Sequence, residues 1–180
     1  HSAAKQSKLT ADANYENAVR QVDIQINSLY NTILDTYDSL KLAEDVFMEF
    51  EAKDYPPEGT ESFKAFLYCE ETEKRFLCGN LIMWGAFDGN KQIATFAIRD
   101  ESHLSLAFVD KYYHRKGVAT LLWNEALSYI SQNKKIREVT VNSSPYGLPF
   151  YKKIGFKEVA EEQLSDGIRY IPMKYIIERQ

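Results

Sequence analysis

Cysteine and histidine are both scarce in this chain of 180 residues. It holds two cysteines, Cys69 and Cys78, and three histidines. Two cysteines cannot build a disulfide framework, and their spacing does not match a Cys-x-x-Cys zinc motif. Three histidines spread over the chain offer no multi-histidine metal centre. We therefore expect two free thiols in a reducing cytoplasm and a site that uses no metal ion.

Long apolar runs and net positive charge are missing as well. Apolar stretches such as residues 81–84 fall far short of the roughly 20 residues that span a bilayer. The first residues are polar and no apolar segment follows them, so the sequence predicts no secretory signal. A formal net charge of −4 argues against general attraction to nucleic acid. We expect a cytoplasmic protein with neither a membrane nor a nucleic-acid partner.

The composition is that of a folded domain, with 44% hydrophobic and 27% charged residues. The length suits one domain. Residues 1–18 are polar and show no sustained periodicity, so we expect a polar extension there and a single domain over 19–180. The chain opens on His1 and Ser2 instead of methionine, and part of the extension is expected to derive from an expression vector.

Hydrophobic periodicity predicts an α+β fold. Apolar residues recur at helical spacing over 29–37, 40–50, 63–67 and 117–132, and a further short helix ends at 154. Asp38 or Ser39 is placed to cap the run 40–50. Strands are predicted over 22–26, 80–87, 91–99, 104–109, 136–142, 156–159 and 168–175. The order is β-α-α-β-β-β-α-β-α-β-β, which favours a mixed, mostly antiparallel sheet flanked by helices, with one βαβ crossover.

Charge is unevenly distributed along the chain. Residues 111–157 contain nine basic and two acidic side chains, although the whole chain is acidic. A basic segment within an acidic protein indicates a locally held anionic ligand. Residues 44–61 show the opposite bias, with seven acidic side chains against Lys53. This acidic stretch either borders a cationic ligand or is a solvated helix face.

The segment 106–122 carries the strongest chemical signal, because a strand runs through a loop and a glycine into an amphipathic helix. Gly117 and Ala119 place small side chains at the helix start, where a ligand can approach the backbone closely. The first amides of a helix lack internal partners and point outward with the positive end of the helix dipole. Arg115 and Lys116 add full positive charges. The loop is therefore suited to bind a polyphosphate.

Residues 114–119, His-Arg-Lys-Gly-Val-Ala, resemble the Q/R-x-x-G-x-G/A signature of the GCN5-related N-acetyltransferases (GNAT). Residues 141–146 and 150–156 resemble that family's second conserved block, and the order of elements is also the family's. The resemblance covers roughly residues 40–175. His114 departs from the usual Gln or Arg, and residues up to about 37 match poorly. A GNAT-like fold is the expectation.

The resemblance implies that acetyl-CoA donates an acetyl group to an amine. Its diphosphate would lie on the main-chain amides of 115–120, and its pantetheine arm between the strands that end at Val109 and Asn142. The amides of Phe108 and Val109 would hold that arm and polarise the thioester carbonyl. The implied cofactor-binding residues are Phe108, Val109, His114, Arg115, Lys116, Gly117, Val118, Ala119, Thr120, Asn142 and Tyr151.

Tyr151 is the implied general acid, because a phenol stays protonated at neutral pH and can donate to the departing thiolate. The alternative is that its ring only packs beneath the sheet. His103 and Glu101 are candidates for the base that deprotonates the amine, and a chain of waters is the other route. Both cysteines lie outside the two motif blocks, which favours direct attack in a ternary complex over an acyl-cysteine.

The expected acceptor is a primary amine on a small cationic molecule, with Glu51 and Asp54 of the acidic stretch as candidate substrate-binding residues. Two alternatives stay open. The acceptor is a lysine or N-terminal amine of a protein, or the domain binds coenzyme A without catalysis. Because members of the family are often dimers, a homodimer is compatible with the resemblance.

Overall fold

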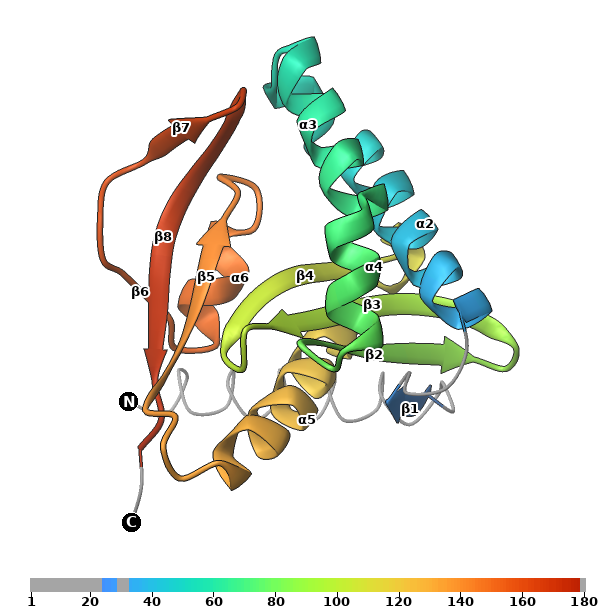
Figure 1. The fold of residues 1–180 in the computed structure, drawn as a ribbon, viewed down its shortest axis with the longest axis vertical. Coiled ribbons are helices and arrows are strands. Elements are labelled where there is room, and N and C mark those ends of the chain that lie inside the picture. The colour runs from blue at the N-terminus through green and yellow to red at the C-terminus, as the bar shows by residue number, and fades with distance from the viewer. Residues whose placement is uncertain (1–23, 29–32, 179–180) are drawn as a thin grey trace, which may run out of the picture.

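The computed structural model describes residues 24–28 and 33–178 (Figure 1). The expected extension 1–18 and the expected structure at 22–23 and 29–32 lie outside the described residues. The elements are β1 (Ile24–Ser28), α2 (Ile33–Phe50), η1 (Ala52–Asp54), α3 (Pro57–Tyr68), α4 (Glu70–Leu77), β2 (Leu81–Asp88), β3 (Lys91–Arg99), β4 (His103–Val109), η2 (Lys111–Tyr113), α5 (Val118–Gln132), β5 (Glu138–Ser143), α6 (Leu148–Lys153), β6 (Lys157–Glu158), β7 (Gln163–Ser165) and β8 (Ile168–Ile176).

The sheet has eight strands and separates into two parts (Figure 1). Its strand order is β1-β2-β3-β4-β5-β8-β6, and β7 pairs with β8. The strand pairs are antiparallel except β4 and β5, which α5 connects as a crossover. These two strands share only the pairs His103↔Thr140 and Leu104↔Val141. Beyond Leu104 they diverge, so one edge of β4 has no neighbouring strand.

A β-bulge in β4 marks the point of divergence. Ala97 of β3 pairs with Leu106, whereas Ile98 pairs with Leu104, so Ser105 has no partner of its own. The extra residue turns the two leucines to opposite faces of the sheet. Leu104 packs in the hydrophobic cluster that contains α5, and Leu106 packs in the cluster that contains α2. The bulge therefore re-aims β4 where the gap between β4 and β5 begins.

Two hydrophobic clusters hold the helices against the two faces of the sheet. On one face, Val118, Leu122 and Ile130 of α5 are almost fully buried against β2, β3 and β4. On the other face, Phe47 of α2 and Leu67 of α3 are buried against β2, β3 and β4. Burial of these apolar side chains supplies the main stabilisation of the arrangement. The two layers leave the edge of β4 open between them.

The α+β class and the mostly antiparallel sheet are confirmed, and the element order gains one helix and one short strand. Helix α4 was not predicted, because residues 70–77 are mostly polar and lack an apolar stripe. Its i,i+4 ion pairs, Glu70–Lys74 and Glu71–Arg75, support it instead. The described part of the expected run 29–37 and the run 40–50 belong to one helix, α2, so neither Asp38 nor Ser39 is a cap. The Ser39 hydroxyl is buried and accepts a hydrogen bond from Gln92 Nε2.

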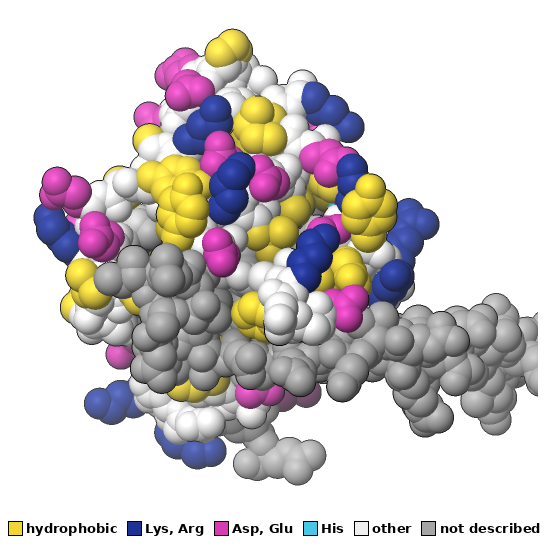
Figure 2. All heavy atoms as spheres, turned by 90° about the vertical axis from the view of Figure 1, so that its right-hand side faces the viewer, with side chains coloured by type: hydrophobic (Ala, Val, Ile, Leu, Met, Phe, Trp, Pro, Cys, Tyr) yellow, Lys and Arg dark blue, Asp and Glu magenta, His cyan; other side chains and the backbone are white. Residues whose placement is uncertain are grey.

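The surface over α2 mixes charges of both signs with single hydrophobic side chains (Figure 2). Exposed apolar side chains on the helices include Met48 and Leu77. In the part of the chain that the structure describes, no helix combines the length and the apolar character needed to cross a bilayer. Among the described residues of this outer face, acidic and basic side chains alternate without a single-sign patch that would attract a charged polymer (Figure 2).

Candidate active site

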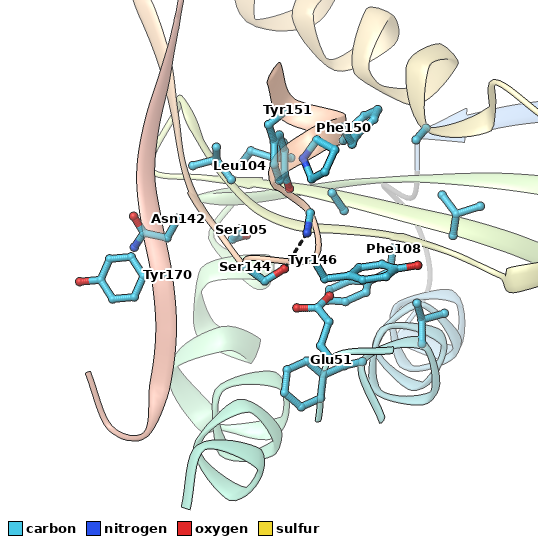
Figure 3. Close-up of a pocket in the computed structure, with 18 of the residues that line it drawn as sticks. Glu51, Leu104, Ser105, Phe108, Asn142, Ser144, Tyr146, Phe150, Tyr151 and Tyr170 are labelled. Carbon is cyan, nitrogen blue, oxygen red and sulfur yellow. Dashed lines mark hydrogen bonds between the residues drawn. The ribbon is translucent and has the colours of Figure 1, made fainter. Parts of the chain in front are cut away.

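A pocket of about 990 Å³ occupies the gap between β4 and β5. Figure 3 shows side chains entering it from several elements that are far apart in the sequence. Contributions come from β4, the start of α5, the loop between β5 and α6, the end of α2 and the β7–β8 hairpin. A cavity of this size is in the range of small-molecule sites.

The open edge of β4 presents main-chain groups to the pocket. Asp110 N–H donates to Ile93 O at 2.8 Å, which fixes the alternation of hydrogen-bonded pairs along β3 and β4. The main-chain groups of Phe108 therefore face β3, and those of Ala107 and Val109 face the gap. The prediction that the Phe108 amide binds a ligand is not supported by this geometry, although its side chain lines the pocket. Ala107 was not predicted.

His114 ties the loop before α5 to this edge. Its Nε2 lies 2.7 Å from Val109 O, and because a carbonyl can only accept, Nε2 carries the proton and donates. Its ring also packs on Phe50, with centroids 4.9 Å apart. His114, which stands where the family usually has Gln or Arg, thus fixes the loop to β4 through this hydrogen bond. Its side chain also lines the pocket.

The start of α5 turns its free amides to the pocket. Gly117 has φ +85°, a conformation that favours glycine, and it offers no side-chain cap. The first helical bond is Leu121 N–H to Gly117 O, so the amides of residues 118–120 precede the bonded part of the helix. Arg115 and residues 117–120 line the pocket. Lys116 does not, and its Nζ lies over the Tyr113 ring, 5.0 Å from the centroid.

Tyr151 of α6 lies with its hydroxyl directed into the pocket (Figure 3). Its side chain is 8% exposed, and its ring packs against Phe150 and Phe156 with centroids 5.3 and 5.5 Å away. Burial, and then the negative charge of Glu51, raises the pKa of the Tyr151 phenol. None of the described residues forms a hydrogen bond with its hydroxyl. The group is therefore protonated at neutral pH and available to a ligand.

Glu51, directly after α2, is the acidic residue that reaches the pocket. Figure 3 shows its carboxylate pointing toward Ser144, beside the rings of Phe108 and Tyr146. Burial raises the pKa of Glu51, and a hydrogen bond from the Ser144 hydroxyl partly opposes the shift. Asp54, the other predicted substrate-binding residue, is exposed on η1 and does not line the pocket.

The two candidate bases lie in different environments. Glu101 occupies a turn with φ +66°, is exposed and does not line the pocket. His103 does line it, and its Nδ1 lies 2.8 Å from Thr140 Oγ1 across one of the two residue pairs that join β4 and β5. Burial, and then the charge of Arg99, lowers the pKa of His103 to about 4. His103 is therefore neutral and only weakly basic.

Several other lining residues were not predicted as site residues. Asn142 lines the pocket as predicted, whereas Ser144 and Tyr146 belong to the run 141–146 of the second conserved block but were given no role. Arg169 and Tyr170 of the β7–β8 hairpin, whose place depends on the turn before β8, were not predicted either. Across residues 24–28 and 33–178, no three His, Cys, Asp or Glu side chains are grouped so that they could hold a metal ion.

Two glycines bring that hairpin against α3. A Cβ built on Gly59 would lie 2.3 Å from Gly167 O, so the two backbones touch. Nearby, Tyr55 Oη donates to Arg169 O at 3.1 Å. Residues from both sides of this contact, including Tyr55 and Arg169, line the pocket. The hairpin and α3 therefore close the pocket on the side away from α5.

Comparisons with known proteins agree with this architecture. Residues 51–177 match the model of the acetyltransferase (GNAT) domain family. An uncharacterised N-acetyltransferase of Escherichia coli K12, YafP, is 32% identical over 75 residues, which are 42% of this chain and 46% of that protein. The match thus spans less than half of that relative.

Two solved structures share the fold. One is a GCN5-related N-acetyltransferase from Rhodopseudomonas palustris, with a TM-score of 0.69, 17% identity, and coverage of 85% of this chain and 95% of the other. Another is the PaiA N-acetyltransferase of Thermoplasma acidophilum in complex with coenzyme A, with a TM-score of 0.68, 22% identity, and coverage of 86% and 99%. The family match over most of the sequence confirms the resemblance, and the chain belongs to the GNAT acetyltransferase family.

Proposed function

We propose that this chain is an acetyl-CoA-dependent N-acetyltransferase that transfers the acetyl group to a primary amine on a small cationic molecule. The observation that carries the proposal is a convergence in one pocket. Unpaired amides at the start of α5 and the buried phenol of Tyr151 meet where β4 and β5 separate. The likeness to a fold solved with coenzyme A, the PaiA structure, supports the choice of donor.

The start of α5 fits a diphosphate. Its free amides and the helix dipole attract an anion, and Arg115 adds a full charge at the same wall of the pocket. Gly117 exposes the backbone because it has no Cβ. The amides of Ala107 and Val109 on the open edge of β4 suit an extended arm that itself carries amides, as pantetheine does. Asn142 faces this arm from β5 in the proposal.

Tyr151 acts in the proposal as the general acid. The amine nitrogen attacks the thioester carbonyl carbon, the carbon–sulfur bond breaks, and the departing sulfur takes the proton of the Tyr151 hydroxyl. Burial supports this role because it keeps the phenol protonated, and its hydroxyl has no competing partner among the described residues. Attack is direct, within a ternary complex, since Cys69 and Cys78 do not line the pocket.

Water carries away the proton of the acceptor ammonium in this proposal. His103 is a weak base because its pKa is lowered to about 4, far from the pKa near the working pH that favours proton transfer. Glu101 lies away from the pocket. Neither sequence candidate is therefore well suited to the task, and a chain of waters through the pocket is the better-supported route.

Calorimetry with coenzyme A, followed by thiol-release assays with acetyl-CoA and a set of amines, tests the proposal. We expect binding, and release of coenzyme A that requires a small primary amine, with KM in the usual range of about 1 μM to 1 mM. Release with lysine peptides or protein N-termini but with no small amine would support the protein acetyltransferase. Binding without release for any acceptor would support a non-catalytic module, and absence of binding would overturn the whole proposal.

A further inference from the structure

Glu51 supplies the negative charge in the lining of the pocket. It is the only carboxylate among the described lining residues, whereas four basic side chains line the same pocket: Arg99, Arg115, Lys153 and Arg169. Arg99 and Arg169 are paired with Asp100 and Glu162, so these two carboxylates are not free for a ligand. A ligand with several positive charges would therefore find one unpaired carboxylate among the described lining residues. A ligand with one positive charge has one matching anionic partner.

Most neighbours of Glu51 in the acidic stretch 44–61 are already paired. Lysine partners are found for four of them, in the pairs Glu44–Lys41, Asp45–Lys41, Glu49–Lys111 and Glu61–Lys64. Glu51 has no cationic partner among the described residues, and its carboxylate points toward Ser144 (Figure 3). A carboxylate removed from water without a counter-ion is costly, and a substrate ammonium would supply the missing charge.

Aromatic rings line the pocket around this carboxylate. Phe47 stacks on Tyr55 with centroids 5.6 Å apart and on Phe63 at 3.9 Å, and Phe63 continues to Phe108 at 5.7 Å. All four rings line the pocket, so they form an unbroken apolar wall that we call the aromatic wall. An ammonium near ring faces gains cation–π attraction, and a flat apolar body gains stacking and burial.

Tyr146 adds a further ring to this part of the pocket and lies beside Phe108 (Figure 3). Its ring stacks on Phe50, with centroids 5.4 Å apart and an interplanar angle of 25°. Burial, and then the charge of Glu51, raises the pKa of the Tyr146 phenol, as it does for Tyr55 and Tyr151. The lining near Glu51 is therefore aromatic and its phenols are protonated at neutral pH.

The contact between α3 and the β7–β8 hairpin bounds one side of the pocket. It consists of the close approach of Gly59 to Gly167 and of the hydrogen bond from Tyr55 Oη to Arg169 O. The Arg169 guanidinium on this side is already paired with Glu162, so it leaves no free carboxylate for a second ammonium. A compact acceptor does not have to part α3 from the hairpin.

We propose that the acceptor is a compact arylalkylamine, with its single ammonium on Glu51 and its flat apolar body against the aromatic wall. This rests on the proposed function and narrows it, because polyamines and lysine-bearing chains then become poor acceptors. Glu51 is a specificity residue in this scheme, since it holds the reacting nitrogen in the pocket beside Ser144 and Phe108.

Thiol-release kinetics with four amines test the proposal: 2-phenylethylamine, n-butylamine, spermidine and Nα-acetyl-lysine amide. We expect kcat/KM for 2-phenylethylamine to exceed each of the others at least ten-fold. Glu51→Gln should raise the KM for 2-phenylethylamine at least ten-fold and leave the affinity for coenzyme A unchanged in calorimetry. Glu61→Gln makes the same charge change in the same acidic stretch, on an exposed side chain outside the pocket, and should alter neither quantity.

The Phe63→Leu variant tests the contribution of ring stacking to acceptor preference separately from that of the Glu51 charge. It preserves an apolar side chain, so we expect it to lower the preference for 2-phenylethylamine over n-butylamine several-fold while coenzyme A binding is retained. A preference for spermidine or the lysine derivative, or equal behaviour of Glu51→Gln and Glu61→Gln, would overturn the proposal. Failure of coenzyme A binding, or of release with every amine, would instead overturn the proposed function itself.

Discussion

The two sides of the pocket are built from different parts of the chain. The side near α5 offers main-chain amides, from residues 118–120 and from the open edge of β4. The side near α3 offers side chains, above all Glu51 and the aromatic wall. Main-chain groups are the same in every residue, so the first side depends on conformation and on small side chains. The second side depends on the identity of each residue, and it is where acceptor choice can vary.

Tyr151 lies where the two sides meet, and the loss of its hydroxyl should lower turnover more than any other change considered. We expect Tyr151→Phe to lower kcat by about 10²- to 10⁴-fold, the usual contribution of a general acid. The affinity for coenzyme A should stay within about two-fold, because the ring and its packing are retained. Steady-state kinetics and calorimetry measure the two quantities. Undiminished turnover would assign Tyr151 to packing alone, the alternative that the sequence left open.

Gly117→Val should damage only the side near α5. The side chain would stand where the diphosphate approaches, at a φ of +85° that is strained for valine. We expect the Kd for coenzyme A to rise on the order of 100-fold. Gly89→Val is the matched control, because Gly89 also has a positive φ, +58°, but lies in the hairpin between β2 and β3, outside the pocket. Equal losses of affinity in both variants would mean that backbone strain alone is responsible.

The difference between main-chain groups near α5 and side chains near α3 explains which parts of the site could be predicted from the sequence. The loop 114–120 follows a strand and begins a helix, so its amides are placed by local structure, and the pocket indeed contains His114, Arg115 and residues 117–120. Phe108 was assigned the wrong main-chain direction, because only the pairing register with β3 shows that its amide points away. Successive residues of a strand point their main-chain groups to opposite edges. The direction of one amide therefore cannot be predicted until the pairing register with the neighbouring strand is known.

The side near α3 was only partly predictable, because its residues come together through tertiary contacts. Both Glu51 and Asp54 belong to one acidic stretch, but Asp54 turns outward on η1 and only Glu51 enters the pocket. Glu101 and His103 are two residues apart, yet only His103 lines the pocket. The hairpin residues Arg169 and Tyr170 reach it because Gly167 fits against Gly59, a contact with no local signal.

Gly59→Val should disturb the side near α3 and spare the other. An added Cβ would clash with Gly167 O, so α3 or the hairpin must shift. We expect the KM for the amine acceptor to rise about ten-fold, the Kd for coenzyme A to stay unchanged, and stability to fall by about 1–3 kcal/mol. Kinetics, calorimetry and thermal unfolding check these outcomes. If coenzyme A binding weakened as much as acceptor binding, the two sides would not be independent.

His103 belongs to neither side, because it lies where β4 and β5 still pair, and its substitution should have the smallest effect on turnover. Its pKa is about 4 in the folded protein and about 6.5 in an unfolded chain, so between these values the unfolded state binds more protons. Stability should therefore fall as pH decreases from 6.5 to 4. The shift limits the effect to about 3 kcal/mol, and partial exposure reduces it to on the order of 1 kcal/mol.

His103→Gln should flatten that part of the pH profile while other titrating groups keep theirs, as denaturant unfolding at several pH values would reveal. The variant also separates two roles. A residue that only joins the strands affects the free energy of unfolding and leaves the chemical step largely intact. A general base would instead cost about 100-fold or more in kcat at neutral pH. Such a loss of kcat, with an unchanged pH dependence of the free energy of unfolding, would identify His103 as the general base in place of water.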